Sequence, residues 1–281
     1  MHEPLSVESG PLVMTVLPGL GGRVLQWTYA GEPVLSGPEA HADNWGATYW
    51  TSPQADWGWP PVVPVDSGPY EVLPADVGQV ALVSGPAQIG QRRFRIEKRF
   101  SPGGSASIDT EYRIVNLGAD SFSMASWEIS RVPPGGLTFF PTGSGVLTPI
   151  PPHGRLALEN AGGVSFYEHA GFRTGESLKA HADGQEGLLA HFVRGSNLLV
   201  LKLFQDSPQQ DQAPGEGEVE LFANFDGRYV EVEVQGPYRS IAPGAASSFS
   251  VRTSIIPVPP AVAADRQALV ALARAKAAEL R

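Results

Sequence analysis

The chain of 281 residues has no cysteine. Disulfide bonds, thiolate nucleophiles and cysteine-ligated zinc are therefore excluded, and the redox state of its compartment is left open. Charged residues make up only 17% of the chain, the net charge is −9, and the basic residues cluster only in the short stretch 91–93. We therefore expect neither a nucleic-acid partner nor an anionic membrane surface, and a neutral or cationic ligand fits better than a polyanion.

Long apolar runs and paired histidines are missing as well. No run reaches the roughly 18 residues that span a bilayer, and the N-terminus lacks the basic and apolar regions of a signal peptide. We expect a soluble, cytoplasmic protein, although a secretory signal already removed would leave the same sequence. The six histidines show no HxxxH or HxH spacing, so we expect no metal site and no cofactor.

Glycine and proline are abundant, with 32 and 26 residues, and they separate short segments of strand-like sequence. In the segment 107–116, apolar and polar side chains alternate, as in a strand with one wet face. Similar segments recur at short spacings up to about residue 256, and Asp226-Gly227 marks a hairpin turn between two of them. This pattern predicts an all-β domain over residues 1–259, either a sandwich or a barrel.

The C-terminal segment has a different composition. After the proline-rich stretch 257–260 the chain becomes rich in Ala, Leu, Arg and Glu, which are strong helix formers. We predict one helix over residues 261–280, with Val262, Leu269 and Leu272 on a single apolar stripe. Such a helix needs a surface to dock on, so residues 260–281 are expected to pack on the β domain or on a partner subunit of a homodimer.

Residues 44–61 hold four of the six tryptophans, Trp45, Trp50, Trp57 and Trp59. Gly and Pro interrupt this segment and no period-2 alternation is visible, so we predict an ordered loop. An indole combines a large apolar face with one N–H donor, which suits the C–H face and hydroxyl rim of a sugar ring. The alternative is a buried aromatic plug at the end of the β domain.

Carboxylates recur in two later segments. In the segment 229–238, Glu231, Glu233 and Gln235 alternate with valines, so the two carboxylates share one face of a strand. They either line a concave sheet, where crowding raises their pKa values toward neutrality, or lie on a solvated outer face. The segment 126–131 adds Glu128 and Arg131 as candidate polar groups.

Four further residues are candidates. Arg23 follows a Gly pair that leaves room for the close approach of backbone or of a ligand, and Trp127 offers another stacking face. His191 lies in an apolar strand-like run, where a histidine is more often a satisfied core residue than a catalyst; His41, next to the tryptophan segment, is the more suggestive histidine.

The order of these segments resembles that of the galactose mutarotase-like superfamily. The Gly-Gly-Arg-Val strand at Arg23, the aromatic segment 44–61, the segment 127–131 and the late strand 231–237 followed by Pro243-Gly244 carry the resemblance. Closest is a bacterial branch with a similar Asn-Trp-Gly…Trp-Pro-Pro loop. The resemblance covers most of residues 10–256 and implies a large antiparallel β-sandwich.

The resemblance also implies a chemistry. In aldose 1-epimerases of this superfamily a carboxylate on a late strand removes the anomeric proton, and a histidine protonates the ring oxygen. Glu233 matches that base, with Glu231 as second choice. Where the family has its histidine this chain has Trp127-Glu128, and the Asn-His and Tyr-Phe-Asn motifs have no counterpart, so the acid is assigned to Glu128, His41 or His191.

The sequence leaves three functions open. One is a sugar-active, epimerase-like enzyme, and the second is a carbohydrate-binding protein without catalysis; the third is a structural sandwich with no sugar ligand. The catalytic candidates are Glu233, Glu231 and Glu128. The candidates for substrate binding are Arg23, Asn44, Trp45, Trp50, Trp57, Trp59, Trp127, Arg131 and His191.

Overall fold

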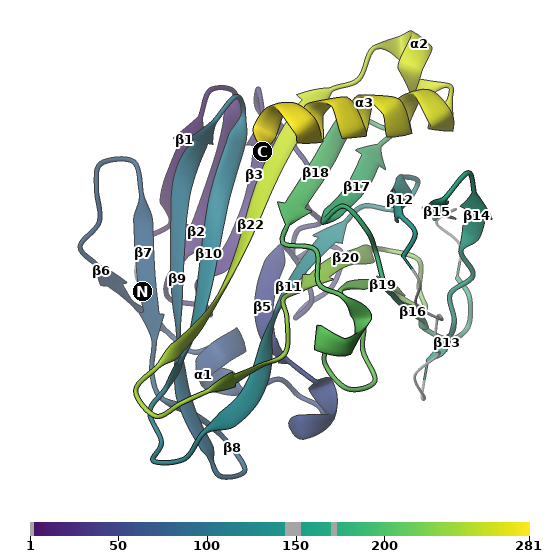
Figure 1. Cartoon of the computed structure of the whole chain (residues 1–281). Coiled ribbons are helices and arrows are strands. Elements are labelled where there is room, and N and C mark those ends of the chain that lie inside the picture. Colours follow the sequence, from purple (N-terminus) through teal and green to yellow (C-terminus); the bar gives the residue numbers. More distant parts are fainter. Residues whose placement is uncertain (1–2, 144–152, 170–172) are drawn as a thin grey trace.

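Two large, mostly antiparallel sheets face each other and form a β-sandwich (Figure 1). The computed structural model describes residues 3–143, 153–169 and 173–281. The fold class predicted from the sequence is confirmed, and the sandwich is the correct alternative to the barrel.

The first sheet carries most of the candidate residues. Its strand order is β1-β2-β3-β5-β11-β20-β19-β16-β13, with β4 beside β3 and β21 beside β11. In chain order these strands are β1 (Leu5–Ser9), β2 (Leu12–Leu17), β3 (Arg23–Tyr29), β4 (Glu32–Pro33), β5 (Ala47–Ser52), β11 (Phe122–Val132), β13 (Gly154–Arg155), β16 (Leu178–Ala182), β19 (Val219–Ala223), β20 (Val230–Gln235) and β21 (Arg239–Ile241).

The second sheet forms the other layer. Its order is β14-β15-β12-β17-β18-β22-β10-β9-β7-β6, with β8 beside β9. In chain order these strands are β6 (Tyr70–Leu73), β7 (Val80–Ser84), β8 (Ala87–Ile89), β9 (Arg92–Gly104), β10 (Ser107–Asn116), β12 (Leu137–Pro141), β14 (Glu159–Ala161), β15 (Val164–Glu168), β17 (Leu188–Val193), β18 (Leu198–Phe204) and β22 (Ala246–Pro257).

The main core lies between the two sheets and includes Val230, Val232 and Val234 of β20 together with Ile114 of β10. Because side chains alternate along a strand, the odd-numbered residues of β20 point to the outward face of the first sheet. That face is not solvated: all six residues of β20 are buried. The hairpin predicted at Asp226-Gly227 does join β19 to β20.

The tryptophan segment is only partly a loop, which corrects the sequence-based expectation. Residues 47–52 form strand β5, and every one of them is buried. The core covers one face of β5 and other aromatic residues cover the other, so polarity does not alternate along it. The loop after β5 contains a single 3-10 turn (Gln54–Asp56) and the short helix α1 (Val63–Asp66).

The C-terminal segment forms two helices rather than the single one predicted. Helix α2 (Pro260–Ala263) and helix α3 (Arg266–Leu280) are separated by Asp265, whose carboxylate caps α3 by accepting hydrogen bonds from two backbone N–H groups. Leu269 and Ala273 of α3 pack with Leu199 and Leu201 of β18 in a second hydrophobic cluster. Helix α3 therefore covers the outward face of the second sheet, away from the candidate residues (Figure 1).

No helix within the described residues is long and apolar enough to cross a membrane.

Candidate functional site

Strand pairing assembles a row of ionisable side chains on the outward face of the first sheet. Glu233 of β20 lies directly opposite Glu220 of β19, and Glu220 lies opposite His181 of β16. Directly opposed residues in antiparallel strands have Cβ atoms about 4.5–5.5 Å apart. Two carboxyl groups from the hairpin of β19 and β20 thus lie in one row with an imidazole from β16, which is distant in the sequence.

Glu233 is completely buried and only half satisfied. Its Oε2 accepts a hydrogen bond from Trp127 Nε1 at 2.7 Å, while its Oε1 has no hydrogen-bond partner. Burial, reinforced by the carboxylates of Glu220 and Glu231, raises the pKa of Glu233 well above its usual value. The raised pKa favours the protonated form of this carboxyl group over its ionised form.

Glu220 links the row to two basic side chains. Its carboxylate forms an ion pair with Lys179 and lies 3.5 Å from Nδ1 of His181, and Gln235 Nε2 donates to it at 3.2 Å. Burial raises the pKa of Glu220 to about 7, against the opposing effect of Lys179. A carboxyl group with that pKa is half ionised near neutrality, which is the condition for efficient proton transfer.

His181 is held in its neutral form. Burial, with a further contribution from the charge of Lys179, lowers the pKa of His181 to about 4. Neither ring nitrogen has a hydrogen-bond partner, so the 3.5 Å approach to Glu220 is not an ion pair at neutral pH. A neutral imidazole can offer one donor and one acceptor to a ligand.

Glu231 is neutralised by Arg131 on the neighbouring strand. Arg131 Nε donates to Glu231 at 2.7 Å, and Arg131 Nη1 donates to Thr48 Oγ1 at 3.1 Å. The guanidinium is fully buried, lies 5.5 Å from the centre of the Trp50 ring, and leaves Nη2 without a partner. The structure thus places Glu231 and Arg131 on the same face as Glu233, where they form an ion pair with each other.

The tryptophans gather around Trp50. Its ring centroid lies 5.1 Å from Trp127, 5.7 Å from Trp57 and 5.9 Å from Trp59, all in edge-to-face contact. Trp50 and Trp127 are buried, whereas Trp59 is 61% exposed. Trp50 of the aromatic segment and Trp127 thus fill a small core, whereas Trp59 is left exposed. Stacking of a sugar on Trp59 stays a prediction.

A hollow of about 450 Å³ opens beside this cluster, and we call it the Arg23 hollow after the buried residue in its wall. The other lining residues used below are Asn44, Trp45, Trp59 and Asp66. The Arg23 guanidinium lies 4.6 Å from the centre of the Trp45 ring and 3.8 Å from the Asp66 carboxylate. Burial lowers the pKa of Arg23 to about 10.

Two predicted residues lie away from this site. Glu128 follows Trp127 in β11, so it points between the sheets, where it accepts hydrogen bonds from Lys202 at 2.7 Å and from Tyr112 at 2.6 Å. His191 lies on β17 of the second sheet, and its Nδ1 is 2.9 Å from Thr138 Oγ1. Neither residue joins Glu233, so neither is retained as its acid partner.

His41 is only partly buried and lies at the edge of the site. Its Nδ1 accepts hydrogen bonds from the backbone N–H groups of Asp43 and Asn44, and its ring contacts Tyr229 edge-on, 5.9 Å between centroids. The Tyr229 hydroxyl in turn accepts from Asn44 Nδ2 at 3.3 Å. His41 thus positions the backbone at Asn44 and is not in the Glu233 row.

The sequence interpretation missed three members of the site. They are Lys179, His181 and His153; the His153 ring contacts Phe222 edge-on, 5.3 Å between centroids. Burial, followed by the charges of Lys179 and His181, lowers the pKa of His153. Alternation within the strand 178–182 could have indicated that Lys179 and His181 share a face, but only the pairing with β19 brings that face to Glu233.

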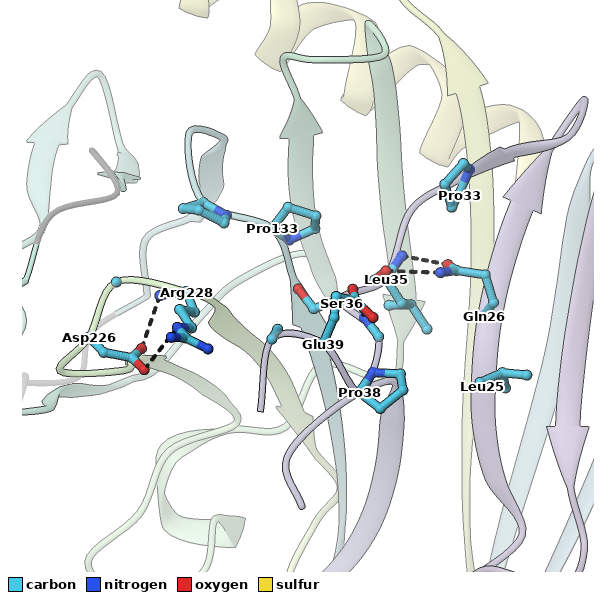
Figure 2. Close-up of a pocket in the computed structure, with 14 residues that line it drawn as sticks. Leu25, Gln26, Pro33, Leu35, Ser36, Pro38, Glu39, Pro133, Asp226 and Arg228 are labelled. Atoms are coloured by element: carbon cyan, nitrogen blue, oxygen red, sulfur yellow. Dashed lines mark hydrogen bonds and ion pairs between the residues drawn. The ribbon is translucent and has the colours of Figure 1, made fainter. Parts of the chain in front are cut away.

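A larger, open hollow of about 970 Å³ lies near the hairpin between β19 and β20 (Figure 2). Its lining includes prolines and side chains already bonded within the protein, such as Gln26 to Leu35 and Asp226 to Arg228 (Figure 2). The residues described along its wall contribute no aromatic ring. Along these described residues the hollow therefore lacks a stacking face for a sugar ring.

Within residues 3–143, 153–169 and 173–281, no three Asp, Glu or His side chains lie close enough together to bind a metal ion.

The architecture is the galactose mutarotase-like fold. Among solved structures, the chain is similar to a galactose mutarotase-like protein from Lactobacillus casei, with a TM-score of 0.65, 10% sequence identity and coverage of 90% of this chain and 100% of that one. A galactose mutarotase related enzyme from Lactobacillus acidophilus gives a TM-score of 0.65 at 8% identity, covering 92% and 99%. Slr1438 from Synechocystis gives 0.62 at 16% identity, covering 91% and 96%.

Neither a protein-family model nor a curated protein sequence matches the chain. The structural similarity confirms the fold that the sequence resemblance implied.

Proposed function

We propose that this protein binds a carbohydrate on the outward face of its first sheet and exchanges protons at the anomeric centre. The observation that carries the proposal is the opposed pair Glu233 and Glu220, because their pKa values are raised and Glu233 Oε1 is buried without a partner. Buried polar atoms are nearly always hydrogen-bonded, so an unpaired oxygen among carboxylates, indoles and cations favours a polar ligand at this point.

The reaction requires one group that takes a proton and one that gives a proton. Removing the proton of the anomeric hydroxyl while protonating the ring oxygen breaks the bond between that oxygen and the anomeric carbon and leaves an open-chain aldehyde. Reclosure on the opposite face of the carbonyl reverses both transfers and gives the other anomer. Glu220, whose pKa is about 7, is suited to accept the proton, and Glu233, whose raised pKa favours its protonated form, is suited to donate one. These roles reverse the base role that the family resemblance implied for Glu233.

The fold supports the same class of ligand. The galactose mutarotase-like neighbours make a sugar the first ligand to test, although a fold alone does not determine function. His181 and Lys179, at the end of the row, are placed to hold hydroxyl groups of a bound ring, because His181 has two unpaired nitrogens.

A carbohydrate-binding protein without catalysis is the second candidate. Glu233 is 0% exposed and one of its oxygens is occupied by Trp127, so a sugar held outside the indoles would not reach the carboxyl pair. Binding would then depend on the tryptophans and on Arg23.

The deciding experiment is proton NMR of glucose and galactose, following saturation transfer from the protein and exchange between the α and β anomeric signals. The proposal expects binding together with accelerated exchange. Glu233→Gln should slow the catalysed exchange by about 10²-fold or more, the usual contribution of a general acid–base group, while saturation transfer persists. Glu71 is an exposed residue of β6 in the other sheet. Glu71→Gln is therefore the matched control and should behave as the unmodified protein.

Exchange that is equally fast in Glu233→Gln would overturn the assignment of this residue. Saturation transfer without accelerated exchange would establish the second candidate in place of the first. Absence of saturation transfer for all sugars tested would contradict both.

A further inference from the structure

The Arg23 hollow and the carboxyl pair lie on the same face of the first sheet. Val24 of β3 pairs with Ala47 of β5, and both belong to the core between the sheets. Their neighbours Arg23 and Thr48 therefore project outward. The hydrogen bond that Arg131, which faces outward, donates to Thr48 agrees with this direction. The outward face is thus continuous from Arg23 to Glu233.

The two places are nevertheless well separated. Strands β3, β5, β11 and β20 are consecutive in the sheet, so three inter-strand steps of about 4.8 Å each place Arg23 and Glu233 roughly 14 Å apart along the sheet. Trp50 stands between them: its Nε1 donates to Asp66 at 2.7 Å on the hollow side, and its ring contacts Trp127 on the other. A single sugar ring is too small to touch both places at once.

The Arg23 hollow has polar groups that the protein does not satisfy. Arg23 is only 4% exposed, and its Nη1 donates to the backbone oxygen of Asp43 at 2.8 Å. Its Nε, however, is buried without a hydrogen-bond partner. A guanidinium and a carboxylate 3.8 Å apart together offer donors and acceptors, which is what a hydroxyl-rich ligand needs.

The mouth of the hollow has a large apolar face. Trp59 is 61% exposed and the adjacent Val63 is 62% exposed. Both residues line the hollow. Exposed large apolar side chains grouped next to polar ones mark binding sites, and an indole lying beside hydroxyl-binding groups can stack on the C–H face of a sugar ring.

We propose that the Arg23 hollow is a second sugar subsite, so that the natural ligand is an oligosaccharide or glycan. Its terminal unit reaches the carboxyl pair, and a unit further along the chain stacks on Trp59 and is bound by Arg23 and Asp66. This inference rests on the proposed function. The second subsite identifies the substrate as an oligosaccharide, whereas the chemistry at Glu233 does not distinguish a monosaccharide from an oligosaccharide.

The test compares binding of monosaccharides and trisaccharides by titration calorimetry, using glucose with cellotriose and maltotriose, and galactose with β-1,4-galactotriose. For at least one series we expect the trisaccharide to bind about tenfold tighter or more than its monosaccharide, the effect of an added aromatic contact. Trp59→Ala should abolish that gain, so that the trisaccharide binds no tighter than its monosaccharide.

Phe225→Ala is the matched control, because Phe225 is 51% exposed but lies in the hairpin between β19 and β20. It should preserve the gain. Since Trp59 is mostly exposed, its replacement should fold, and Arg23→Gln provides a second variant inside the hollow that should reduce the gain as well.

Equal affinities for monosaccharide and trisaccharide in every series would overturn the second subsite while leaving the proposed function intact. Full retention of the gain by Trp59→Ala would overturn it equally. Failure of every sugar to bind would overturn the proposed function and the subsite together.

Discussion

At the scale of single residues, the two faces of β11 give neighbouring side chains opposite roles. Trp127 donates to Glu233 on the outward face, while Glu128 lies between the sheets with Lys202. Lys202 also donates to Ser130 Oγ at 2.7 Å. Adjacent residues in a strand cannot act on the same ligand from one face, which is why Glu128 serves the core rather than the site.

The buried pair of Glu128 and Lys202 makes a prediction about stability. Replacing one partner, as in Glu128→Leu, leaves an unpaired charge in the core and should lower the free energy of unfolding by about 3–5 kcal/mol. The double variant Glu128→Leu/Lys202→Met removes both charges and should recover most of that loss. Urea denaturation of both single variants and the double variant measures the coupling between them.

If the double variant lost the sum of the two single losses, the ion pair would contribute no coupling and this account of Glu128 would be wrong. Exchange of sugar anomers by the double variant, compared at equal folded fraction, should remain that of the unmodified protein, because neither side chain reaches the outward face.

At the scale of elements, strand β5 places the tryptophan-rich segment 44–61 beside the site. Thr48 and Trp50 point outward and contact Arg131 and Trp127, whereas Ala47 and Tyr49 belong to the core. The strand is buried on both faces, so burial gives it no alternating pattern. The loop that follows carries Trp57 and Trp59 back over the outward face.

Helix α3 supplies a prediction at the same scale. Asp265 caps the helix, with its Oδ1 accepting from Gln267 N at 2.8 Å. Asp265→Ala should lower the free energy of unfolding by about 1 kcal/mol, the usual cost of a lost N-cap, whereas Asp265→Ser should restore most of it. Guanidinium denaturation followed by circular dichroism measures the difference. A loss in the serine variant as large as that in the alanine variant would show that the cap is not the cause.

At the scale of the whole molecule, both layers of the sandwich contain buried histidines, and these make folding pH-dependent. Burial lowers the pKa of His191 to about 3 and that of His181 to about 4. The folded state therefore binds these protons more weakly than the unfolded chain. Their contribution to stability is complete above the unfolded pKa of about 6.5 and is lost as the pH falls below it.

Glu220 changes stability in the opposite direction. Its pKa is raised in the folded state, so folding disfavours its charged form and the stability falls as the pH rises.

The prediction concerns the difference between the protein and one variant, so that the other titrating groups cancel. Between about pH 6 and pH 4, the unmodified protein should lose up to about 1.4 kcal/mol per pH unit more than His191→Gln does. Urea denaturation at several pH values gives both curves. Parallel curves across this range would mean that His191 is accessible to protons in the folded state.

Much of the architecture is determined by the sequence itself. The frequent Gly and Pro residues, the alternating segments and the Asp226-Gly227 turn predicted short antiparallel strands, and the order of the motifs predicted the fold that the solved structures share. Local signals suffice for these features because strand alternation, tight turns and helix composition depend on neighbouring residues alone. The tail was correctly predicted as helical for the same reason, apart from the break at Asp265.

Only the tertiary structure decided which side chains meet. His181 is brought into one row with Glu220 and Glu233 by the pairing of β16 with β19, which are not consecutive strands, and no local pattern contains that register. The same applies to Glu128 and His191, whose residue types suited a site but whose strands point them into the core. The extent of burial is likewise a property of the assembled sheets. Glu233 is buried, which raises its pKa, whereas Trp59 is exposed. The sequence alone does not distinguish the burial of these two candidates.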